Sequence, residues 1–211
     1  QLPFLLKVIA PDRALSLQVH PSLEQAARGF EQENAEGVAP DSPVRSFKDS
    51  NHKPEMVLAL TRFEAVAGFR APRRAAEVLG GLDSPPARRM RRTLRLNPTR
   101  FGIRQAFTEL VCADTRPEAS EMAELVAEIS RRLAEGRSPS RRVDANVVEM
   151  ARAFPHDPGI AAALLLNPVT LRRGEALFVP AGSVHAYISG LGVEIMASSD
   201  NVLRAGLTTK H

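Results

Sequence analysis

The two ends of the chain have strand-like sequence, whereas the middle has helix-like sequence. Short apolar runs separated by turn signals occupy residues 1–70 and 160–211. Residues 72–156 instead carry apolar side chains at helical spacing. Strands divided in this way must pair across the helical block to bury their apolar faces. The sequence therefore predicts an α+β fold, mainly β: a barrel or sandwich formed by residues 1–71 and 157–211, interrupted by an α-helical insertion subdomain at residues 72–156.

Two helices have clear signals. Within the first strand-rich region, Ser22, an acidic first turn and Gly37 predict a short helix between the two residues. In the helical block, apolar residues recur at i, i+3, i+4 and i+7 ahead of Gly136: Met122, Leu125, Val126, Ile129 and Leu133. Such a stripe is more typical of a helix packed on a core than of a cofactor-binding surface.

The composition excludes several classes of protein. Hydrophobic residues make up 44% and charged residues 25%, as in ordinary globular domains. The longest apolar run is far too short to cross a bilayer, and the N-terminal residues lack the features of a signal peptide. The single cysteine, Cys112, provides no disulfide framework and fits a reducing compartment. We therefore expect a cytoplasmic protein with no membrane partner.

The basic residues do not indicate nucleic-acid binding. The net charge of +4 and the pI of about 9.8 could suggest it. However, aromatic residues make up only 5%, with no Trp and one Tyr, and stacking on single strands needs aromatic side chains. The arginines gather in runs that resemble solvated helix faces. We expect no nucleic-acid partner.

Lysine is rare in this chain: of 28 basic residues, only Lys7, Lys48, Lys53 and Lys210 are lysines. Arginine cannot act as a base near neutral pH, whereas the pKa of a lysine shifts readily. A chain so biased toward arginine retains lysine either by chance at the surface or where arginine cannot serve. The four lysines are therefore candidates for function.

Polar side chains are aligned on two predicted strands. Alternation places Ser16, Gln18 and His20 on one strand face, which is either exposed to water or gathered around a ligand. In SNHKPEM, Lys53 and Glu55 share a face at the start of an apolar strand. Burying such charges costs roughly several kcal/mol unless they are paired or bound to a metal. The stretch is therefore either a solvated strand end or a buried site that requires a partner.

A third segment has the spacing G(x)5PxGxxH, from Gly174 to His185. A Pro-Gly turn separates two strands, and the second strand presents His185 and Tyr187 on one face. This spacing resembles the second motif of cupin barrels, in which the histidine points into the barrel and binds a metal. A fourth segment, the strand end at Glu194 and a polar loop at residues 198–211, contains Asp200, Arg204 and Lys210.

Four side chains from these segments form a plausible metal-ligand set: Gln18, His20, Glu55 and His185. One amide oxygen, two imidazoles and one carboxylate suit Zn²⁺ and leave room for water or substrate. Manganese, iron and cobalt are also compatible with these ligand types.

Together these segments resemble the type I mannose-6-phosphate isomerases, members of the cupin superfamily. The matching stretches are LPFLLKV, LSLQVHP, RGFEQENAEGV, FKDSNHKPEMVLALT, LLLNPVTLRRGEALFVPAGSVHAY and GVEIMASSDNVLRAGLTTKH. The resemblance implies a cupin-like jelly-roll and a zinc-dependent aldose–ketose isomerase that interconverts mannose 6-phosphate and fructose 6-phosphate through an enediol. It implies one zinc per chain and a monomer in the full-length family form. Family members usually extend beyond both ends of this sequence, so we expect a truncated chain.

The resemblance also implies roles for individual residues. Gln18, His20, Glu55 and His185 would bind the zinc. The substrate pocket would be formed by Lys7, Ser16, Lys53, Tyr187, Glu194, Asp200, Arg204 and Lys210. We hypothesise that Lys53 carries the proton, that His52 assists ring opening and that Arg204 steadies negative charge, with Asp200 and Glu194 as competing bases. Lys7, Ser16 and Lys210 would hold the phosphate.

Three alternatives remain. A non-catalytic metal-binding cupin, such as a sugar sensor, would keep the four ligands and tolerate loss of Lys53 and Arg204. A metal-dependent oxygenase on the same barrel usually has His-x-His, whereas this chain has Gln18 at the first position. A nucleic-acid binder would show a basic stripe and salt-dependent binding.

Overall fold

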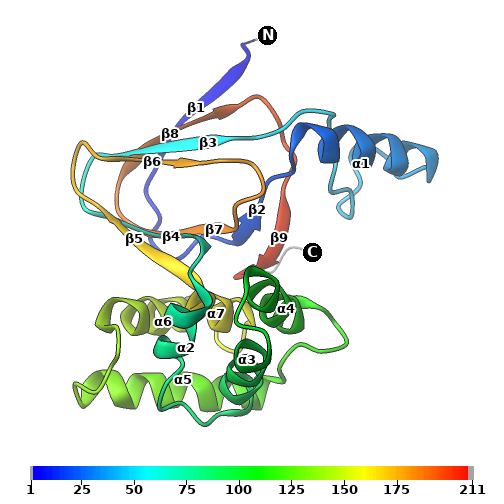
Figure 1. Ribbon diagram of the computed structural model, residues 1–211. Helices are drawn as coiled ribbons and strands as arrows, with labels where there is room; N and C mark the ends of the chain where they lie inside the picture. Colours follow the sequence, from blue (N-terminus) through cyan, green and yellow to red (C-terminus); the bar gives the residue numbers. More distant parts are fainter. Residues whose placement is uncertain (1, 209–211) are drawn as a thin grey trace.

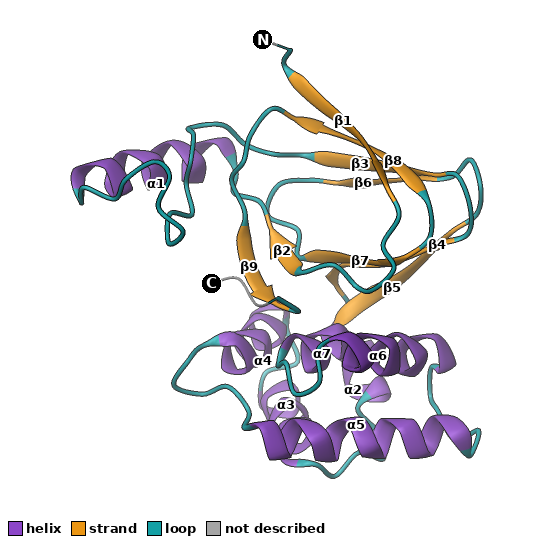
Figure 2. Ribbon diagram, turned by 180° about the vertical axis from the view of Figure 1, so that it is seen from behind, coloured by secondary structure: helices purple, strands orange, loops and turns teal. Residues whose placement is uncertain are grey.

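The computed structural model describes residues 2–208, which form three stacked layers. A four-stranded sheet lies at one end, a five-stranded sheet in the middle and a group of helices at the other end (Figure 1). The same order of layers is visible from behind (Figure 2). The helix that follows the second strand projects sideways from the sheets.

Both sheets are antiparallel. The four-stranded sheet has the order β1 (Phe4–Ile9), β8 (Gly192–Ala197), β3 (Glu55–Ala59) and β6 (Ala176–Val179). The five-stranded sheet has the order β5 (Leu166–Leu171), β4 (Phe63–Phe69), β7 (His185–Ser189), β2 (Leu17–Val19) and β9 (Leu203–Gly206). Each sheet therefore combines strands from both ends of the sequence, as the division of the strand-like sequence predicts.

The helical block enters between β4 and β5. It consists of α2 (Pro72–Val78), α3 (Pro85–Leu96), α4 (Arg100–Val111), α5 (Ala119–Ala134) and α6 (Arg141–Ala153), then the short α7 (Gly159–Ala162) and the 3₁₀ turn η1 (Ala163–Leu165). The predicted α+β class, a cupin-like sandwich with inserted helices, is confirmed, although helices hold more residues than strands. The division into a β domain and a helical subdomain remains a prediction.

The five-stranded sheet is covered on both faces. On one face, Leu17, Val66, Ala186 and Ile188 share a core with the helices. On the other face, Tyr187 joins side chains of β3, β4 and β5 in a smaller core between the sheets. Strand β7 is consequently buried at four successive positions instead of alternating. The helical block and the middle sheet are thus held by one continuous core.

Two predicted helices are confirmed. Helix α1 (Leu23–Ala35) begins after Ser22, whose side chain accepts a hydrogen bond from the Gln25 amide while Gln25 reaches back to the Ser22 amide. Helix α5 carries the predicted stripe: Met122, Leu125 and Ile129 are inaccessible to solvent, and Val126 and Leu133 are half-buried.

One local prediction is wrong. The sequence predicted a polar loop throughout residues 198–211, but residues 203–206 form β9. This strand pairs with β2, and Gly206 lies so close to Gly159 that a Cβ atom at Gly206 would stand 2.8 Å from the Gly159 Cα. Long-range pairing therefore makes a strand from a segment whose own composition indicates a loop.

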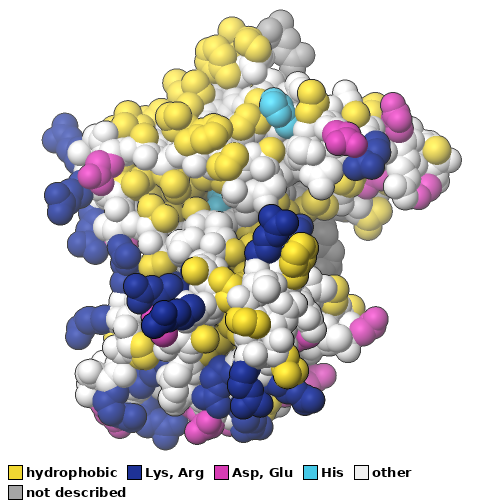
Figure 3. Space-filling view, in the orientation of Figure 1, with side chains coloured by type: hydrophobic (Ala, Val, Ile, Leu, Met, Phe, Trp, Pro, Cys, Tyr) yellow, Lys and Arg dark blue, Asp and Glu magenta, His cyan; other side chains and the backbone are white. Residues whose placement is uncertain are grey.

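The outer face of the four-stranded sheet is apolar and exposed. A row of directly paired residues crosses all four strands: Leu6, Ile195, Met56 and Phe178. Each of these side chains is at least 40% exposed. Hydrophobic side chains gather over the sheets in Figure 3, whereas Lys and Arg gather along the helical layer. Among residues 2–208, the structure contains no helix long and apolar enough to cross a bilayer.

Candidate metal centre

The predicted ligands converge between the two sheets. Gln18 lies at the centre of β2 opposite His185, the first residue of β7, and His20 follows β2 directly. Glu55 is the first residue of β3 in the other sheet. The turn before His185 is anchored to the same place, because the Gly182 amide donates to the His20 carbonyl at 2.7 Å. Gly182 has a φ of +83°, a conformation that glycine adopts at little cost.

The donor atoms form a tight, buried cluster. Glu55 Oε1 lies 3.0 Å from His20 Nε2, and Glu55 Oε2 lies 3.2 Å from His185 Nε2. His20, Glu55 and His185 each offer one ligand atom within 4.8 Å of the others, and all three side chains are at most 2% exposed. Gln18 Nε2 lies 3.3 Å from His185 Nε2. Because the two ends of an amide have almost the same shape, a half-turn of the Gln18 amide presents its oxygen at that place.

The hydrogen bonds of the two histidines determine which ring atoms face the carboxylate. His20 Nδ1 donates to the Asn201 carbonyl at 2.7 Å, and His185 Nδ1 donates to the Ser183 carbonyl at 3.0 Å. Carbonyl oxygens only accept, so each Nδ1 carries a hydrogen, and a ring without a second proton directs its Nε2 lone pair toward Glu55. Two lone pairs facing a carboxylate require either additional protons or a cation among them. This arrangement fits a metal ion such as zinc, whose histidine ligands usually donate their other N–H to an oxygen.

The electrostatics of the cluster keep its carboxylate ionised. Burial by itself raises the pKa of Glu55. The hydrogen bonds from His185 and His20 and the positive charges of His20 and Lys53 outweigh burial, so the pKa of Glu55 lies well below its usual value. Lys53 Nζ lies 3.3 Å from Glu55 Oε1, and the Lys53 side chain is 13% exposed. The buried charge of Glu55 in SNHKPEM is therefore partnered by His20 and His185 from the other sheet and by the neighbouring Lys53.

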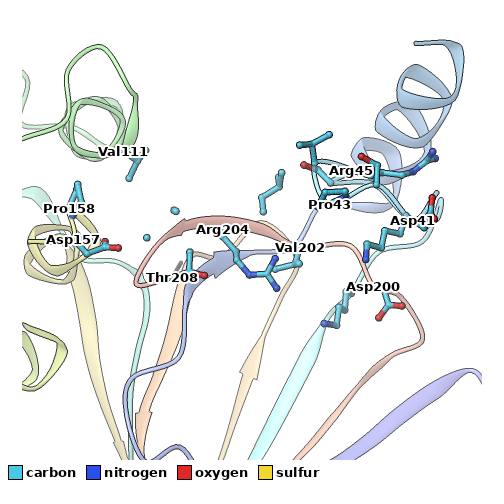
Figure 4. A pocket seen from close by; sticks show the side chains of 18 of the residues that line it. Asp41, Pro43, Arg45, Val111, Asp157, Pro158, Asp200, Val202, Arg204 and Thr208 are labelled. Atoms are coloured by element: carbon cyan, nitrogen blue, oxygen red, sulfur yellow. The ribbon is translucent and has the colours of Figure 1, made fainter. Parts of the chain in front are cut away.

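A large cavity opens beside Lys53. It has a volume of about 1030 Å³ and lies between β9, the loop at residues 41–48, and the ends of α4 and α7 (Figure 4). Arg204 stands in the middle of the view, with Val111 and Asp157 on one side and the 41–45 loop on the other. The predicted residues that line this cavity are Lys7, Lys53, Asp200 and Arg204.

Other predicted residues lie elsewhere. Tyr187 and Glu194 are buried between the sheets, and Ser16 and His52 are half-buried; none of these four belongs to the described cavity lining. Burial, followed by the negative charge of Glu55, raises the pKa of both the Glu194 carboxyl and the Tyr187 phenol. Lys210 lies outside the described residues.

The cavity also contains cations that sequence reasoning did not assign to the site: Arg45, Lys48 and Arg116. The rarity of lysine was a signal for Lys48, although no motif supported it. Arg45 has structural partners, since it donates to Asn34 Oδ1 and to the Val38 and Phe47 carbonyls. The lysines within residues 2–208 are Lys7, Lys48 and Lys53, and all three line this cavity.

The fold and the cluster together define a class: a cupin-like β-sandwich with a candidate histidine–carboxylate metal site between its sheets and a cationic cavity beside it. A family model described as "Phosphomannose isomerase type I, catalytic domain" matches residues 1–72. Over its whole length the chain is similar to curated proteins named mannose-6-phosphate isomerase, and it spans about half the length of these relatives.

Individual relatives support this relationship. Mannose-6-phosphate isomerase of Escherichia coli K12 is 36% identical over 223 residues, which cover 100% of this chain and 52% of the relative. The rat protein of the same name is 32% identical, with 100% and 49% covered. A crystal structure of the apo form from Salmonella typhimurium has a TM-score of 0.86 at 36% identity, and a zinc-bound structure has a TM-score of 0.82 at 36% identity. Each covers 100% of this chain and 52% of the solved one.

Proposed function

We propose that this chain carries the catalytic metal centre of a zinc-dependent mannose-6-phosphate isomerase. The observation that supports the proposal most directly is the buried cluster of His20, Glu55 and His185, which adjoins a cationic cavity through Lys53. The similar proteins are named mannose-6-phosphate isomerases, and one similar crystal structure is described as zinc bound. Because the chain spans about half of such relatives, its activity in isolation is part of the proposal.

In this proposal the ligands are His20, Glu55 and His185, with the amide oxygen of Gln18 as the fourth. Zinc would supply a Lewis acid that polarises the sugar oxygens on which negative charge develops. The two Nδ1–H groups, held by main-chain carbonyls, keep both Nε2 lone pairs directed at the centre. One carboxylate leaves the zinc site with a net positive charge, which suits an anionic intermediate.

The residues of the cavity would bind the sugar phosphate and move its protons. Isomerisation takes a proton from C2 of the aldose and returns one to C1, while a proton passes between the two oxygens. Lys53 is our candidate for the proton carrier, since its Nζ stands at the border between the cluster and the cavity. Arg204 would stabilise negative charge, and Lys7 would bind the phosphate together with Ser16 and Lys210.

The remaining assignments are also proposals. Asp200, which lines the cavity, and Glu194 are competing bases, and the raised pKa of Glu194 favours its protonated form. Tyr187 would shape the pocket from its buried position, and His52 would assist ring opening. The single cysteine supports a cytoplasmic location.

The decisive test is isomerase activity of the 211-residue chain toward mannose 6-phosphate, measured with zinc bound and again after chelation. We expect turnover that the chelator abolishes and added zinc restores. Zinc bound at one equivalent with no turnover, both in this chain and in a chain extended at both ends to the length of the relatives, would instead support the non-catalytic metal-binding alternative.

A further inference from the structure

Asn201, in the loop between β8 and β9, is fully buried beside the metal cluster, although no motif assigned it a role. Its main-chain carbonyl accepts the 2.7 Å hydrogen bond from His20 Nδ1. That bond determines which ring nitrogen of His20 faces Glu55. Asn201 therefore contacts one of the candidate ligands, His20, directly.

The side-chain amide of Asn201 binds a second segment. Its Oδ1 accepts from the Lys48 amide at 2.7 Å and from the Asp49 amide at 3.2 Å. Its Nδ2 donates to the Asp49 carbonyl at 2.7 Å and to the Asn51 carbonyl at 2.9 Å. All four hydrogen-bonding positions of the amide are thus used on residues 48–51. Aspartate lacks the two donors and serine lacks the reach, so these contacts specify asparagine.

Neighbouring residues complete the same arrangement. Ser199 Oγ accepts from the Asn201 amide at 3.2 Å and donates to the Asn51 carbonyl at 3.2 Å. Asp49 Oδ2 accepts from the Asp200 amide at 2.9 Å. Two loops that are about 150 residues apart in sequence are consequently joined by a buried hydrogen-bond network. One loop leads into Lys53 and Glu55, and the other leads into β9, which carries Arg204.

We infer that Asn201 is the positioning residue of the metal centre. Its main chain orients His20, and its side chain fixes the segment that delivers Lys53 and Glu55 from the other sheet. The inference rests on the proposed function, since the cluster is taken as a zinc site. Removal of an outer-shell partner of this kind typically lowers metal affinity by roughly 10–100-fold.

The test measures the zinc dissociation constant of the 211-residue chain by competition with a chromophoric chelator, in the absence of substrate. Asn201→Ala removes all four side-chain bonds, and Asn201→Asp removes the two donated bonds while keeping the volume. We expect zinc affinity to fall roughly 10–100-fold in both variants. Replacement of zinc by cobalt(II) should show an altered visible spectrum in the same variants, because the geometry of the ligands changes.

The matched control is Asn146→Ala, which removes another buried asparagine in α6, within the helical layer. It should leave the zinc dissociation constant of the chain unchanged. If Asn201→Ala does not fold, Ser199→Ala, which removes only the supporting hydroxyl, should give a smaller loss of affinity in the same direction.

The outcomes separate the two proposals. Unchanged zinc affinity in the folded Asn201 and Ser199 variants, with zinc bound tightly by the unaltered chain, would overturn the role of Asn201 and leave the proposed function intact. Failure of the unaltered chain to bind zinc would overturn both. Weakened affinity in the Asn201 variants together with an unaffected Asn146→Ala variant would establish the positioning role.

Discussion

At the scale of single residues, Lys53 stands between the buried cluster and the cavity. Lys53→Met keeps most of the side-chain volume but removes the ammonium group. If Lys53 carries the proton, we expect kcat to fall by roughly 10²–10⁴-fold while the zinc content stays at one per chain. Lys48→Met removes a different lysine from the same cavity wall and controls for loss of charge alone. A near-normal kcat for Lys53→Met would show that another group moves the proton.

Glu194 supplies a pH-dependent prediction at the same scale. Its pKa is raised, first by burial and then by the charge of Glu55, so the folded chain keeps this proton to a higher pH than the unfolded chain does. Ionisation of Glu194 therefore lowers the free energy of unfolding at neutral pH. Glu194→Gln should raise the thermal midpoint of the zinc-free chain at neutral pH.

The gain from Glu194→Gln should shrink as the pH falls below the ordinary carboxyl value of 4.5, where Glu194 is protonated in both states. Thermal unfolding followed by circular dichroism across this range measures both parts. Glu64→Gln, at a carboxylate on β4 away from the cluster, provides a comparison. A gain of equal size at every pH would contradict the electrostatic explanation.

At the scale of secondary-structure elements, α5 and α6 are joined by a buried ion pair. Arg132 donates to Asp144 through Nε at 2.7 Å and through Nη2 at 2.5 Å, and its Nη1 donates to the Gly80 carbonyl at 3.0 Å. Arg132→Met leaves Asp144 buried without its partner, so we expect a loss of about 3–5 kcal/mol in the free energy of unfolding. Urea denaturation measures it.

The exposed pair between Arg137 and Glu135 is the control for this prediction. Arg137→Met should cost only about 0–1 kcal/mol, because solvent screens the exposed charges. Similar losses for the two variants would mean that burial does not determine the contribution of the Arg132 pair.

At the scale of the whole molecule, the candidate ligands connect the two sheets and the two ends of the sequence. Zinc that binds only the folded chain should raise the free energy of unfolding by about 4 kcal/mol when free zinc is about 1,000 times the dissociation constant. Thermal midpoints with zinc and with a chelator test this. Glu55→Gln removes the central carboxylate and should abolish most of the difference; an undiminished shift would place the zinc elsewhere.

Local features were predicted where their causes are local. The helix after Ser22 follows from its capping residues, and the stripe on α5 follows from its periodicity. Alternation along β2 correctly separated Leu17, which packs on the helices, from Gln18 and His20, which face the cluster. These arguments need only neighbours within a few residues.

Several features that depend on distant partners were not predicted. Strand β9 exists because it pairs with β2, and the burial of Arg132 depends on Asp144 from the next helix. Asn201 gave no signal because its partners, His20 and residues 48–51, are about 150 or more residues away in sequence. Lys48 gave only the weak signal of being one of four lysines.

The sequence by itself determined the kinds of element, the chemistry of the candidate ligands and the resemblance to a family of isomerases, because residue types and short spacings carry that information. Only the tertiary structure decided that Glu55 meets two histidines from the opposite sheet, that Lys53 borders the cavity, and that Asn201 holds His20 and the 48–51 segment together. These contacts arise when strands from the two ends of the chain pair across the helical block, and no local pattern encodes that geometry.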